Sequence, residues 1–545
     1  MEAVTTVLVL LLAVVTSGFL VRLSPVPLPL PILQIGLGAL LAAWLGLGIT
    51  LDPELFFLLF LPPLLFLDGW RIPKRGLFRD AAAIVELALG LVLFTVLGIG
   101  LFIHWMIPAM PLAVAFALAA VLSPTDPIAV SAVAARVPIP HRLMHILEGE
   151  SLLNDASGLV CLRFAIAAAM TGAFSLSEAA LTFAQLALGG IALGVAVTWG
   201  VMRAQRALVR RIGEDPGAQV LISLLIPFGA YLAAEHVHVS GILAAVSAGI
   251  TMSYTENSGR ALAATRIRRT AVWDTVQFAA NGVIFVLLGE QLPAILMGAA
   301  ETVRQTGHHD AWWLPVYVLA IAVALGLLRL GWVWASLQFT LYRARRAGQA
   351  RPRVGWRVLV ATSLAGVRGA ITLAGVLTLP LALPDGTPFP ARDLAIFLAM
   401  GVILVSLVGA SLLLPPVLQG LSLPPEDAHD AELDRARRFA TDAAMRAIER
   451  AQHRLAEGRA EADLYAEAAA RSMEPYRLGA VGTQEDEAAA ARGRRILAIE
   501  RELRLAGLRA ERDELYRLRR QRSISDETLQ ELVHEIDLGE ASLAR

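Results

Sequence analysis

The sequence predicts an all-α polytopic membrane protein, with about thirteen transmembrane helices and a helical cytoplasmic tail. Apolar residues make up 56% of its 545 residues and charged residues only 17%, values outside the usual range for water-soluble domains. Apolar runs close to the ~20 residues that cross a bilayer recur as far as about residue 420. After Pro424 and Pro425 the composition changes to Ala, Arg, Glu and Asp. We therefore expect a transmembrane domain over residues 1–420 and a cytoplasmic helical tail over 421–545.

Positively charged residues in the loops predict the orientation of the spans. The spans are expected at residues 4–21, 28–47, 53–70, 80–103, 111–135, 146–171, 179–202, 218–235, 239–254, 274–298, 312–337, 357–381 and 393–417. Lys and Arg concentrate in alternate loops, at Arg71, Lys74, Arg75 and Arg79; Arg136 and Arg142; Arg203, Arg206, Arg210 and Arg211; Arg260, Arg266, Arg268 and Arg269; and Arg343, Arg345, Arg346, Arg351 and Arg353. The other loops contain little more than Arg304 and Arg392. Because cytoplasmic loops carry the excess of Lys and Arg, we expect the N-terminus outside the cell (inner) membrane and the tail inside.

Composition also narrows the classes of function. The formal net charge is zero, so the charge balance indicates neither a nucleic acid nor an acidic protein as a partner. The single cysteine, Cys161, lies in an apolar stretch, which leaves no disulfide framework and no cysteine-based metal site. The sequence contains neither a Gly-rich phosphate-binding loop nor a cluster of metal-ligand residues. We therefore expect no ATP coupling and no cofactor.

The fifth predicted span is interrupted by Ser123-Pro124-Thr125-Asp126-Pro127. Each proline lacks an N–H, and its ring pushes away the carbonyl group one turn earlier, so the helix is expected to break here. Non-helical backbone at membrane depth occurs where it is buried in protein or lines a cavity. Asp126 could balance the positive end of a second half-helix, and Thr125 could offer an oxygen ligand. The alternative is a simple kink that Asp126 caps.

Carboxylate, amide and hydroxyl groups gather on one side of the sixth span. At ~100° per residue, Ser151 and Asp155 share one stripe of the helix, and Glu150 and Asn154 share the neighbouring stripe. Hard oxygen ligands of this kind suit a small alkali cation. A carboxylate without a permanent partner can exchange that cation for a proton. The alternative is a purely structural role for Asn154 and Asp155.

The twelfth span places Arg368 between Gly366 and Gly369 in an otherwise apolar helix. Glycines lower the cost of unwinding and allow a second helix to approach closely. An arginine does not lose its proton at ordinary pH, so a buried one needs a fixed anion, and Glu150 is the expected partner. The alternative, an arginine whose side chain reaches the membrane surface, requires a position closer to the end of the span.

The positions of the interrupted spans predict an internal repeat. Spans five and six correspond to spans twelve and thirteen, which come seven spans later and therefore run in the opposite direction. Broken helices at matching positions of two inverted repeats are typical of transporters with a binding site near the membrane midplane. We therefore expect inverted repeats with two crossing discontinuous helices.

In these motifs the sequence resembles the monovalent cation:proton antiporter-1 family, of the NhaP and sodium/hydrogen exchanger type. The resemblance covers the whole membrane part. It is carried by Thr125-Asp126-Pro127, Glu150-Ser151 with Asn154-Asp155, Gly366-Val367-Arg368-Gly369, and more weakly by the segment from Asn281 to Gly289. The family implies secondary active exchange of Na+ for H+ by alternating access, and a homodimer whose subunits each have a core domain and a dimerisation domain.

The resemblance also implies roles for individual residues. Asp155 is expected to hold either the cation or the proton. The expected ion-binding residues are Asp155, Ser151, Thr125, Asp126 and Asn154, with Na+ at Asp155, Ser151 and Thr125. Asn154 would support the site, and Glu150 would form a structural ion pair with Arg368.

The third span departs from the family pattern. In some relatives a glutamate directly after Pro-Pro-Leu-Leu-Phe approaches the ion. Here Leu67 follows Phe66, and Asp68 comes one position later. Because one residue is ~100° of helix, the role is not carried over to Asp68, which remains a separate candidate.

The residues also predict the stoichiometry. Asn154 stands where electrogenic relatives have a second titrating aspartate, and the only lysine of the chain, Lys74, lies in a loop. If Glu150 and Arg368 cancel, Asp155 alone changes its occupancy. We therefore expect electroneutral exchange of one cation for one proton.

Two other functions are alternatives to Na+/H+ exchange. K+/H+ exchange on the same scaffold is left open, because selectivity depends on cavity size and ligand distance; Li+ is a third possible cargo. An intramembrane aspartyl protease would use Asp126 and Asp155 as an acid/base pair, but the sequence has no Gly-x-Gly-Asp motif, and a protease would leave Arg368 unexplained. The expected partners are membrane lipid and a second copy of the chain. The tail could bind a regulator, contact the dimer partner, or form a solvated helix bundle.

Overall fold

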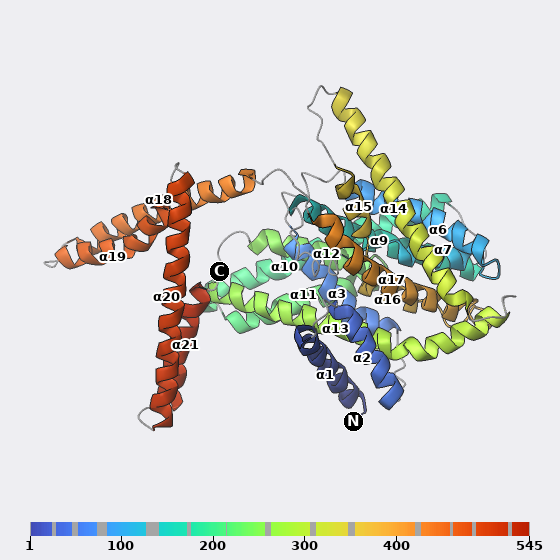
Figure 1. Ribbon diagram of the computed structural model, residues 1–545, viewed down its shortest axis with the longest axis horizontal. Helices are drawn as coiled ribbons and strands as arrows, with labels where there is room; N and C mark the ends of the chain where they lie inside the picture. Colours follow the sequence, from blue (N-terminus) through green and yellow to red (C-terminus); the bar gives the residue numbers. More distant parts are fainter. Residues whose placement is uncertain are drawn as a thin grey trace. The chain divides into compact units, whose positions relative to one another are not determined.

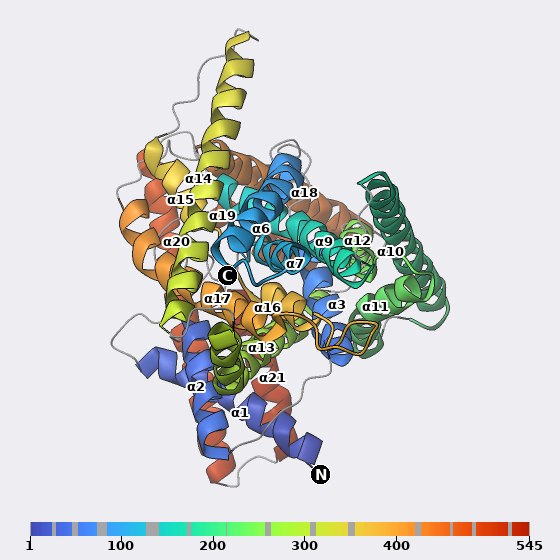
Figure 2. The same cartoon turned by 90° about the vertical axis from the view of Figure 1, so that its right-hand side faces the viewer.

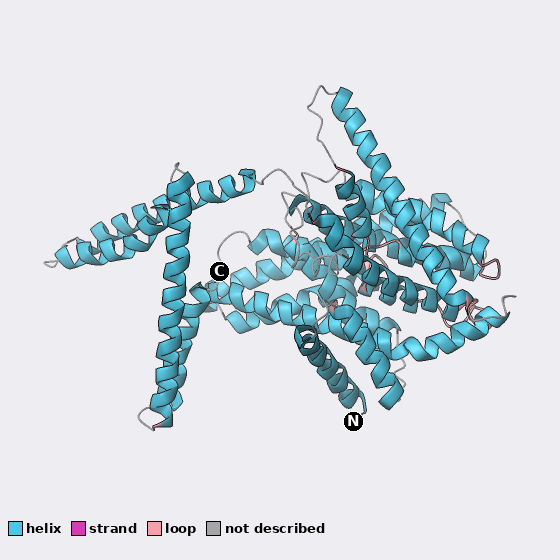
Figure 3. Cartoon of the chain, in the orientation of Figure 1, coloured by secondary structure: helices cyan, strands magenta, loops and turns pink. Residues whose placement is uncertain are grey.

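The computed structural model describes residues 2–23, 29–45, 53–72, 84–126, 141–171, 176–213, 215–256, 263–305, 312–346, 355–419, 427–457, 462–481, 487–521 and 526–543. The chain forms two compact units, Met1–Leu421 and Ser422–Arg545 (Figure 1). Within the described ranges it is helical apart from short loops and an isolated bridge between Ala382 and Pro388 (Figure 3). The predicted all-α class is confirmed.

The first unit has a helix in each of the thirteen expected span ranges. Its helices are α1 (Glu2–Leu23), α2 (Leu30–Leu45), α3 (Pro53–Arg71), η1 (Glu86–Leu91) continuing into α6 (Val92–Met106), α7 (Leu112–Leu122), α9 (His141–Thr171), α10 (Leu176–Ile212), α11 (Pro216–His236), α12 (Gly241–Glu256), α13 (Ala263–Gln305), α14 (Trp313–Arg346), α15 (Trp356–Leu364), α16 (Ala370–Leu377) and α17 (Arg392–Leu418). Among the described residues, eight helical stretches are long and apolar enough to cross a bilayer, and three shorter apolar helices lie within α2, α7 and α12. The number of spans that actually cross remains a prediction.

Some helices are longer than the apolar stretches that predicted them. Helix α10 continues through Arg203, Arg206 and Arg210 to Ile212, where a loop was expected. Hydropathy marks only the part of a helix that suits hydrocarbon, whereas arginine is a good helix former and its side chain is stable in water. The helix can therefore continue past the membrane boundary.

Close packing fixes α13 against α2 in this unit. A Cβ atom added at Gly38 would lie 1.9 Å from the carbonyl oxygen of Val286, and one added at Gly289 would lie 1.9 Å from that of Ile35. Glycine thus allows the two backbones to touch, as is common between membrane helices, whose association is driven by packing and not by hydrophobicity. The contact holds α13 in place along the middle of its length.

Helices α7 and α9 form the centre of the packing that positions the site. Helix α7 packs against α6, α9, α16 and α17, and α10 and α11 pack against each other on one side of the unit in the view of Figure 2. Small side chains allow this close arrangement, since Ala115, Ala117, Ala119 and Ala120 of α7 are all fully buried.

Two of the helices are broken, and their non-helical segments cross. Helix α7 ends at Leu122 and residues 123–126 are not helical, while residues 365–369 separate α15 from α16. The Asp126 N–H donates a hydrogen bond of 2.7 Å to the Val367 carbonyl oxygen. The two predicted interruptions are thus non-helical and cross each other, as expected. Pro127 and the rest of the fifth span, residues 128–135, lie outside the described residues, so its second half-helix stays a prediction.

The local sequence explains the first of these breaks. Pro124 has no N–H, so it cannot donate to the carbonyl oxygen of Ala120 one turn earlier. The Ser123 hydroxyl donates to that oxygen instead, at 2.9 Å. The helix therefore ends without leaving this buried carbonyl unsatisfied.

The second unit consists of four helices, α18 (Asp427–Ala456), α19 (Ala462–Val481), α20 (Glu487–Arg520) and α21 (Asp526–Leu543), in its described part. Helix α18 packs against α19, and α20 against α21. Arg512 of α20 bridges Asp537 and Glu540 of α21, at 2.7 Å to each. Because these ion pairs are partly exposed, they should contribute little to the free energy of unfolding, but they link α20 to α21 at defined positions.

Candidate ion-binding site

A small cavity lies where the two broken helices cross. We call it the central cavity; its lining residues are Leu64, Asp68, Pro124, Thr125, Asp126, Ser151, Asp155, Gln277, Asn281, Gly369, Ala370, Ile371 and Thr372. Its volume is about 30 Å³, enough for one or two water-sized particles. Most of its polar atoms belong to carboxylate, hydroxyl and amide groups, which are the hard oxygen ligands that alkali cations prefer.

Asp155 and Ser151 reach the central cavity from the same face of α9. They are four residues apart, which places them one above the other on a helix. The exposed fraction of Asp155 is 3% and that of Ser151 is 5%, so both are buried inside the unit and neither faces lipid. The structure brings them together with Thr125 and Asp126 in one cavity, the arrangement that the sequence suggested.

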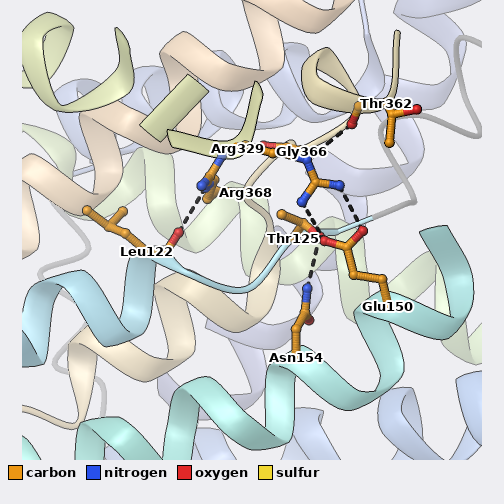
Figure 4. Close-up of polar contacts among 8 residues, drawn as sticks. All are labelled: Leu122, Thr125, Glu150, Asn154, Arg329, Thr362, Gly366 and Arg368. Carbon is orange, nitrogen blue, oxygen red and sulfur yellow. Dashed lines mark hydrogen bonds and ion pairs between the residues drawn. The ribbon is translucent and has the colours of Figure 1, made fainter. Parts of the chain in front are cut away.

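A chain of hydrogen bonds supports Thr125 from behind the cavity (Figure 4). The Asn154 side-chain amide donates to the Thr125 hydroxyl oxygen at 3.0 Å, and that hydroxyl donates to Glu150 at 3.2 Å. Asn154 and Glu150 are both fully buried but are not among the residues that line the cavity. Asn154 therefore positions Thr125 in this structure and does not line the central cavity.

Glu150 pairs with Arg329 of α14, which corrects the expected pairing with Arg368. Both guanidinium Nη atoms of Arg329 donate to the Glu150 carboxylate, one of them at 2.8 Å, and Arg329 Nε donates to the Thr362 carbonyl oxygen at 3.1 Å. The bidentate geometry gives the carboxylate a complete partner within the membrane unit. Arg329 is not among the residues predicted from the sequence, although an arginine inside an otherwise apolar span is a sufficient signal.

Arg368 is buried against backbone carbonyl groups (Figure 4). Its Nε donates to the carbonyl oxygen of Leu122 at 2.9 Å, and its Nη1 donates to the carbonyl oxygen of Gly366. Leu122 is the last residue of α7, where unsatisfied carbonyls carry the negative end of the helix dipole. The cation therefore caps one broken helix and ties it to the other, a role that needs no carboxylate.

Gly369 allows Asp126 to approach the second broken helix. A Cβ atom at Gly369 would lie 1.8 Å from the Asp126 carboxylate oxygen Oδ2. We expect Gly369→Ala to displace Asp126 and to lower the exchange rate by about tenfold or more, because misplacement of a site residue by ~1 Å has effects of this size. The rate of cation-driven proton movement in proteoliposomes measures this.

Gly331 of α14 provides the control for that substitution. A Cβ atom added there meets nothing within 4 Å. The variant Gly331→Ala should therefore keep the wild-type rate, and equal rates for the two alanine variants would contradict the close contact at Gly369.

Residues of helices α3 and α13 complete the lining of the central cavity. Asp68 of α3 lines it, while Leu67 is buried with an exposed fraction of 1%. Asp68 thus reaches the cavity despite the one-residue shift.

Gln277 and Asn281 of α13 also line the cavity, although the sequence did not predict them there. They are neutral residues one turn apart on a helix, and this spacing of two polar residues within an apolar stretch could have indicated that they face a common site.

Comparison with known proteins identifies the family. Residues 7–420 match the sequence model described as "Sodium/hydrogen exchanger, transmembrane". The chain belongs to the sodium/hydrogen exchanger family.

Relatives match this sodium/hydrogen exchanger over nearly its full length. It is 44% identical over 549 residues to a protein of Escherichia coli (strain K12) named "Uncharacterized Na(+)/H(+) exchanger YjcE", covering 100% of this chain and 99% of the relative. It is 39% identical over 544 residues to a "Sodium, potassium, lithium and rubidium/H(+) antiporter" of Bacillus pumilus (strain SAFR-032), covering 99% and 78%. The archaeal sodium proton antiporter MjNhaP1 of Methanocaldococcus jannaschii matches in structure with a TM-score of 0.56 at 18% identity, covering 77% of this chain and 99% of that one. At that identity the match shows a shared fold.

Family membership decides between the classes of function considered above. As a member of this family, the chain is a multi-pass membrane transporter of the cation/proton antiporter type and not an enzyme. The alternative of an intramembrane aspartyl protease is therefore wrong.

Proposed function

We propose that this chain exchanges Na+ for H+ across the membrane by alternating access around Asp155. One observation carries the proposal: Asp155 is buried in a small cavity at the crossing of two broken helices, beside Ser151, Thr125 and Asp126. A buried carboxylate with oxygen ligands around it can bind a dehydrated cation or a proton. Li+ and K+ are further candidate cargo.

Competition at Asp155 would couple the two fluxes. Several carboxylates share the cavity, and their mutual repulsion disfavours an empty, fully ionised site. A site neutralised by Na+ or by H+ is cheaper to move through a region of low dielectric than a bare carboxylate. The empty site would therefore stay on one side of the membrane, so each ion returns only in exchange for the other.

The proposal is tested with purified protein in liposomes that enclose a pH-sensitive dye. With the interior of the liposomes made acidic, addition of Na+, Li+ or K+ in turn to the outside should produce an efflux of protons that depends on the protein. Absence of proton movement with every alkali cation would contradict antiport.

K+ is a second candidate for the transported cation. The Bacillus pumilus relative is named for sodium, potassium, lithium and rubidium exchange, which favours K+ as an additional cargo of this chain. A proton response to K+ of the same size as that to Na+ would support the broader exchange, and a response to Na+ and Li+ alone would support the narrower one.

Exchange of one cation for one proton should be electroneutral. Glu150 and Arg329 form a closed ion pair, and Arg368 carries a fixed charge that is the same in both halves of the cycle. If Asp68 and Asp126 keep the same charge throughout, only the occupant of Asp155 differs between the Na+-loaded and the H+-loaded site, and the two occupants have equal charge. With Na+ as the transported cation, we expect the exchange rate in proteoliposomes to be unchanged when a membrane potential is imposed without a gradient of any other alkali cation.

The same measurement on protein-free liposomes controls for leak. A clear acceleration at one sign of potential and slowing at the other would contradict equal charge movement in the two halves of the cycle.

The assembly and topology are proposals as well. We propose a homodimer in the cell (inner) membrane with the N-terminus outside and the tail in the cytoplasm, where the tail could bind a regulator. The alternation of Lys and Arg between loops supports this orientation. The roles of Asp68 and Asp126 in holding the ion, and of Asn154 in supporting Thr125, belong to the same proposal.

A further inference from the structure

We propose that Asn281 of α13 supplies a neutral oxygen ligand to the cation in the central cavity and so helps to determine which alkali cation is carried. The inference rests on the antiport function proposed above and deepens it. The other expected ligands, Asp155 and Ser151 on α9 and Thr125 just after α7, come from different helices than Asn281, which lies on α13.

The surroundings of Asn281 carry the proposal. Asn281 lines the central cavity together with Asp155. Its side-chain oxygen Oδ1 is shielded from solvent and accepts no hydrogen bond from the described residues. A buried carbonyl oxygen without a donor is costly, and a bound cation would remove that cost. Amide oxygens are also among the hard ligands that coordinate cations in proteins.

The neighbouring amide of Gln277 has a different role. Gln277 lines the same cavity one turn earlier on α13, but its Oε1 accepts a hydrogen bond from Arg71 Nη1 at 2.8 Å. Arg71 is held in turn by an ion pair with Asp274. Of these two amides, Asn281 is therefore the one whose oxygen is available to an ion.

The backbone beside Asn281 is held firmly, as ion selection requires. A Cβ atom at Gly282 would lie 2.5 Å from the Val14 side chain of α1 and 3.0 Å from Gln34 Nε2 of α2. The contact between Gly289 and α2 fixes α13 two turns further on. A ligand on a rigid helix keeps a set distance from the ion, and that distance discriminates between cations of different radius.

The neutrality of the amide predicts which properties it controls. An amide carries no charge and does not titrate, so it leaves the charge balance of the cycle unchanged. In a cavity of about 30 Å³ the loss of one ligand should weaken cation binding, and small ions, which gain most from a close oxygen, should lose most. Proton binding at Asp155 should be affected less.

The experiment compares Asn281→Ala with wild type in proteoliposomes, using Na+, Li+ and K+ as probes at fixed pH. We expect the half-saturating concentration of Na+ and of Li+ to rise by about tenfold, and that of K+ to rise less. The maximal rate at saturating Na+ should stay close to wild type. Half-saturating concentrations equal to wild type for all three cations would overturn the proposal.

Gln34→Ala is the matched control, because Gln34 is a buried amide on α2 that packs beside Gly282 without lining the cavity. It should keep the wild-type order of cations; the same shift in this variant would overturn the proposal, since it would indicate a general packing effect. If Asn281→Ala does not purify, Asn281→Ser, which keeps a shorter oxygen-bearing side chain, should show a shift of the same direction.

A second readout separates this inference from the proposed function. Na+ should raise the thermal unfolding temperature of the wild-type protein in detergent, and higher Na+ concentrations should be needed for the Asn281 variant. If wild type binds Na+ in this assay but moves no protons, the antiport proposal fails while the role of Asn281 is still tested. Equal Na+ dependence in the two proteins would overturn the role of Asn281.

Discussion

Asp155→Asn is expected to abolish exchange while leaving a folded protein. Asparagine has nearly the same shape as aspartate but cannot bind a proton or neutralise a cation, so neither half of the cycle could proceed. Asp155 is not hydrogen-bonded to the supporting chain of Asn154, Thr125 and Glu150, so that chain should persist. Proton movement driven by Na+, Li+ and K+ in proteoliposomes should fall to the level of protein-free liposomes.

The matched control for this substitution is Asp385→Asn, the same chemical change in an exposed loop. Asp385 accepts hydrogen bonds from the Thr387 backbone N–H and hydroxyl, and these bonds lower the pKa of its carboxyl group. This variant should exchange at the wild-type rate. Persistent exchange by Asp155→Asn, in protein whose elution from a sizing column matches wild type, would refute the role of Asp155.

Arg329→Gln should destabilise the membrane unit strongly. Arg329 and Glu150 have side-chain exposed fractions of 3% and 1%, so removing the arginine leaves a buried carboxylate without its partner. Loss of one member of a buried pair costs about 3–5 kcal/mol. The expected result is a large fall in the amount of monodisperse protein after heating in detergent, and little or no exchange.

The double variant Glu150→Gln with Arg329→Gln tests the cause of that effect. Removing both charges abolishes the stranded anion, so the double variant should be more stable than Arg329→Gln alone. Arg163→Gln is a control at a half-exposed ion pair, Arg163–Glu235 at 3.1 Å, where the expected cost is at most about 1 kcal/mol. Equal stability of Arg329→Gln and Arg163→Gln would contradict the importance of the buried pair.

The sequence could predict the broken helices because their causes are local. Pro124 removes a backbone donor, and Gly366 and Gly369 permit an unwound backbone, whatever the rest of the chain does. The stripe of Ser151 and Asp155 follows in the same way from the helical period. Apolar length likewise predicted where the helices lie, whereas the orientation that the loop charges indicate stays a prediction.

The partners of buried charges could not be predicted from the sequence in the same way. Arg269, Arg329 and Arg368 are all buried in the described part of the unit, and the bond from Arg329 to Glu150 spans 179 positions of the chain. Which arginine reaches Glu150 depends on how α14 packs beside α15, and no local rule fixes that packing. Arg368 illustrates the same point, because the carbonyls it caps became available only where α7 ends next to the second broken helix.

Neutral residues of the cavity were missed for a different reason. Gln277 and Asn281 are amides in a long helix, and a polar residue without a charge costs too little in a membrane span to stand out. Asp68 was not assigned the role of the family glutamate because it comes one position later, which corresponds to ~100° of rotation in a regular helix. In the structure α3 contains Pro62 and Pro63, and Asp68 still faces the cavity.

Proton release on Na+ binding tests the central claim most directly. Purified protein in weakly buffered detergent solution, at a pH where the site is protonated, should release one proton for each Na+ that it binds, measured with a pH-indicator dye alongside calorimetric titration. The Asp155→Asn variant should release none. Binding of Na+ without proton release, or equal release by wild type and Asp155→Asn, would contradict competition of the two ions for this carboxylate.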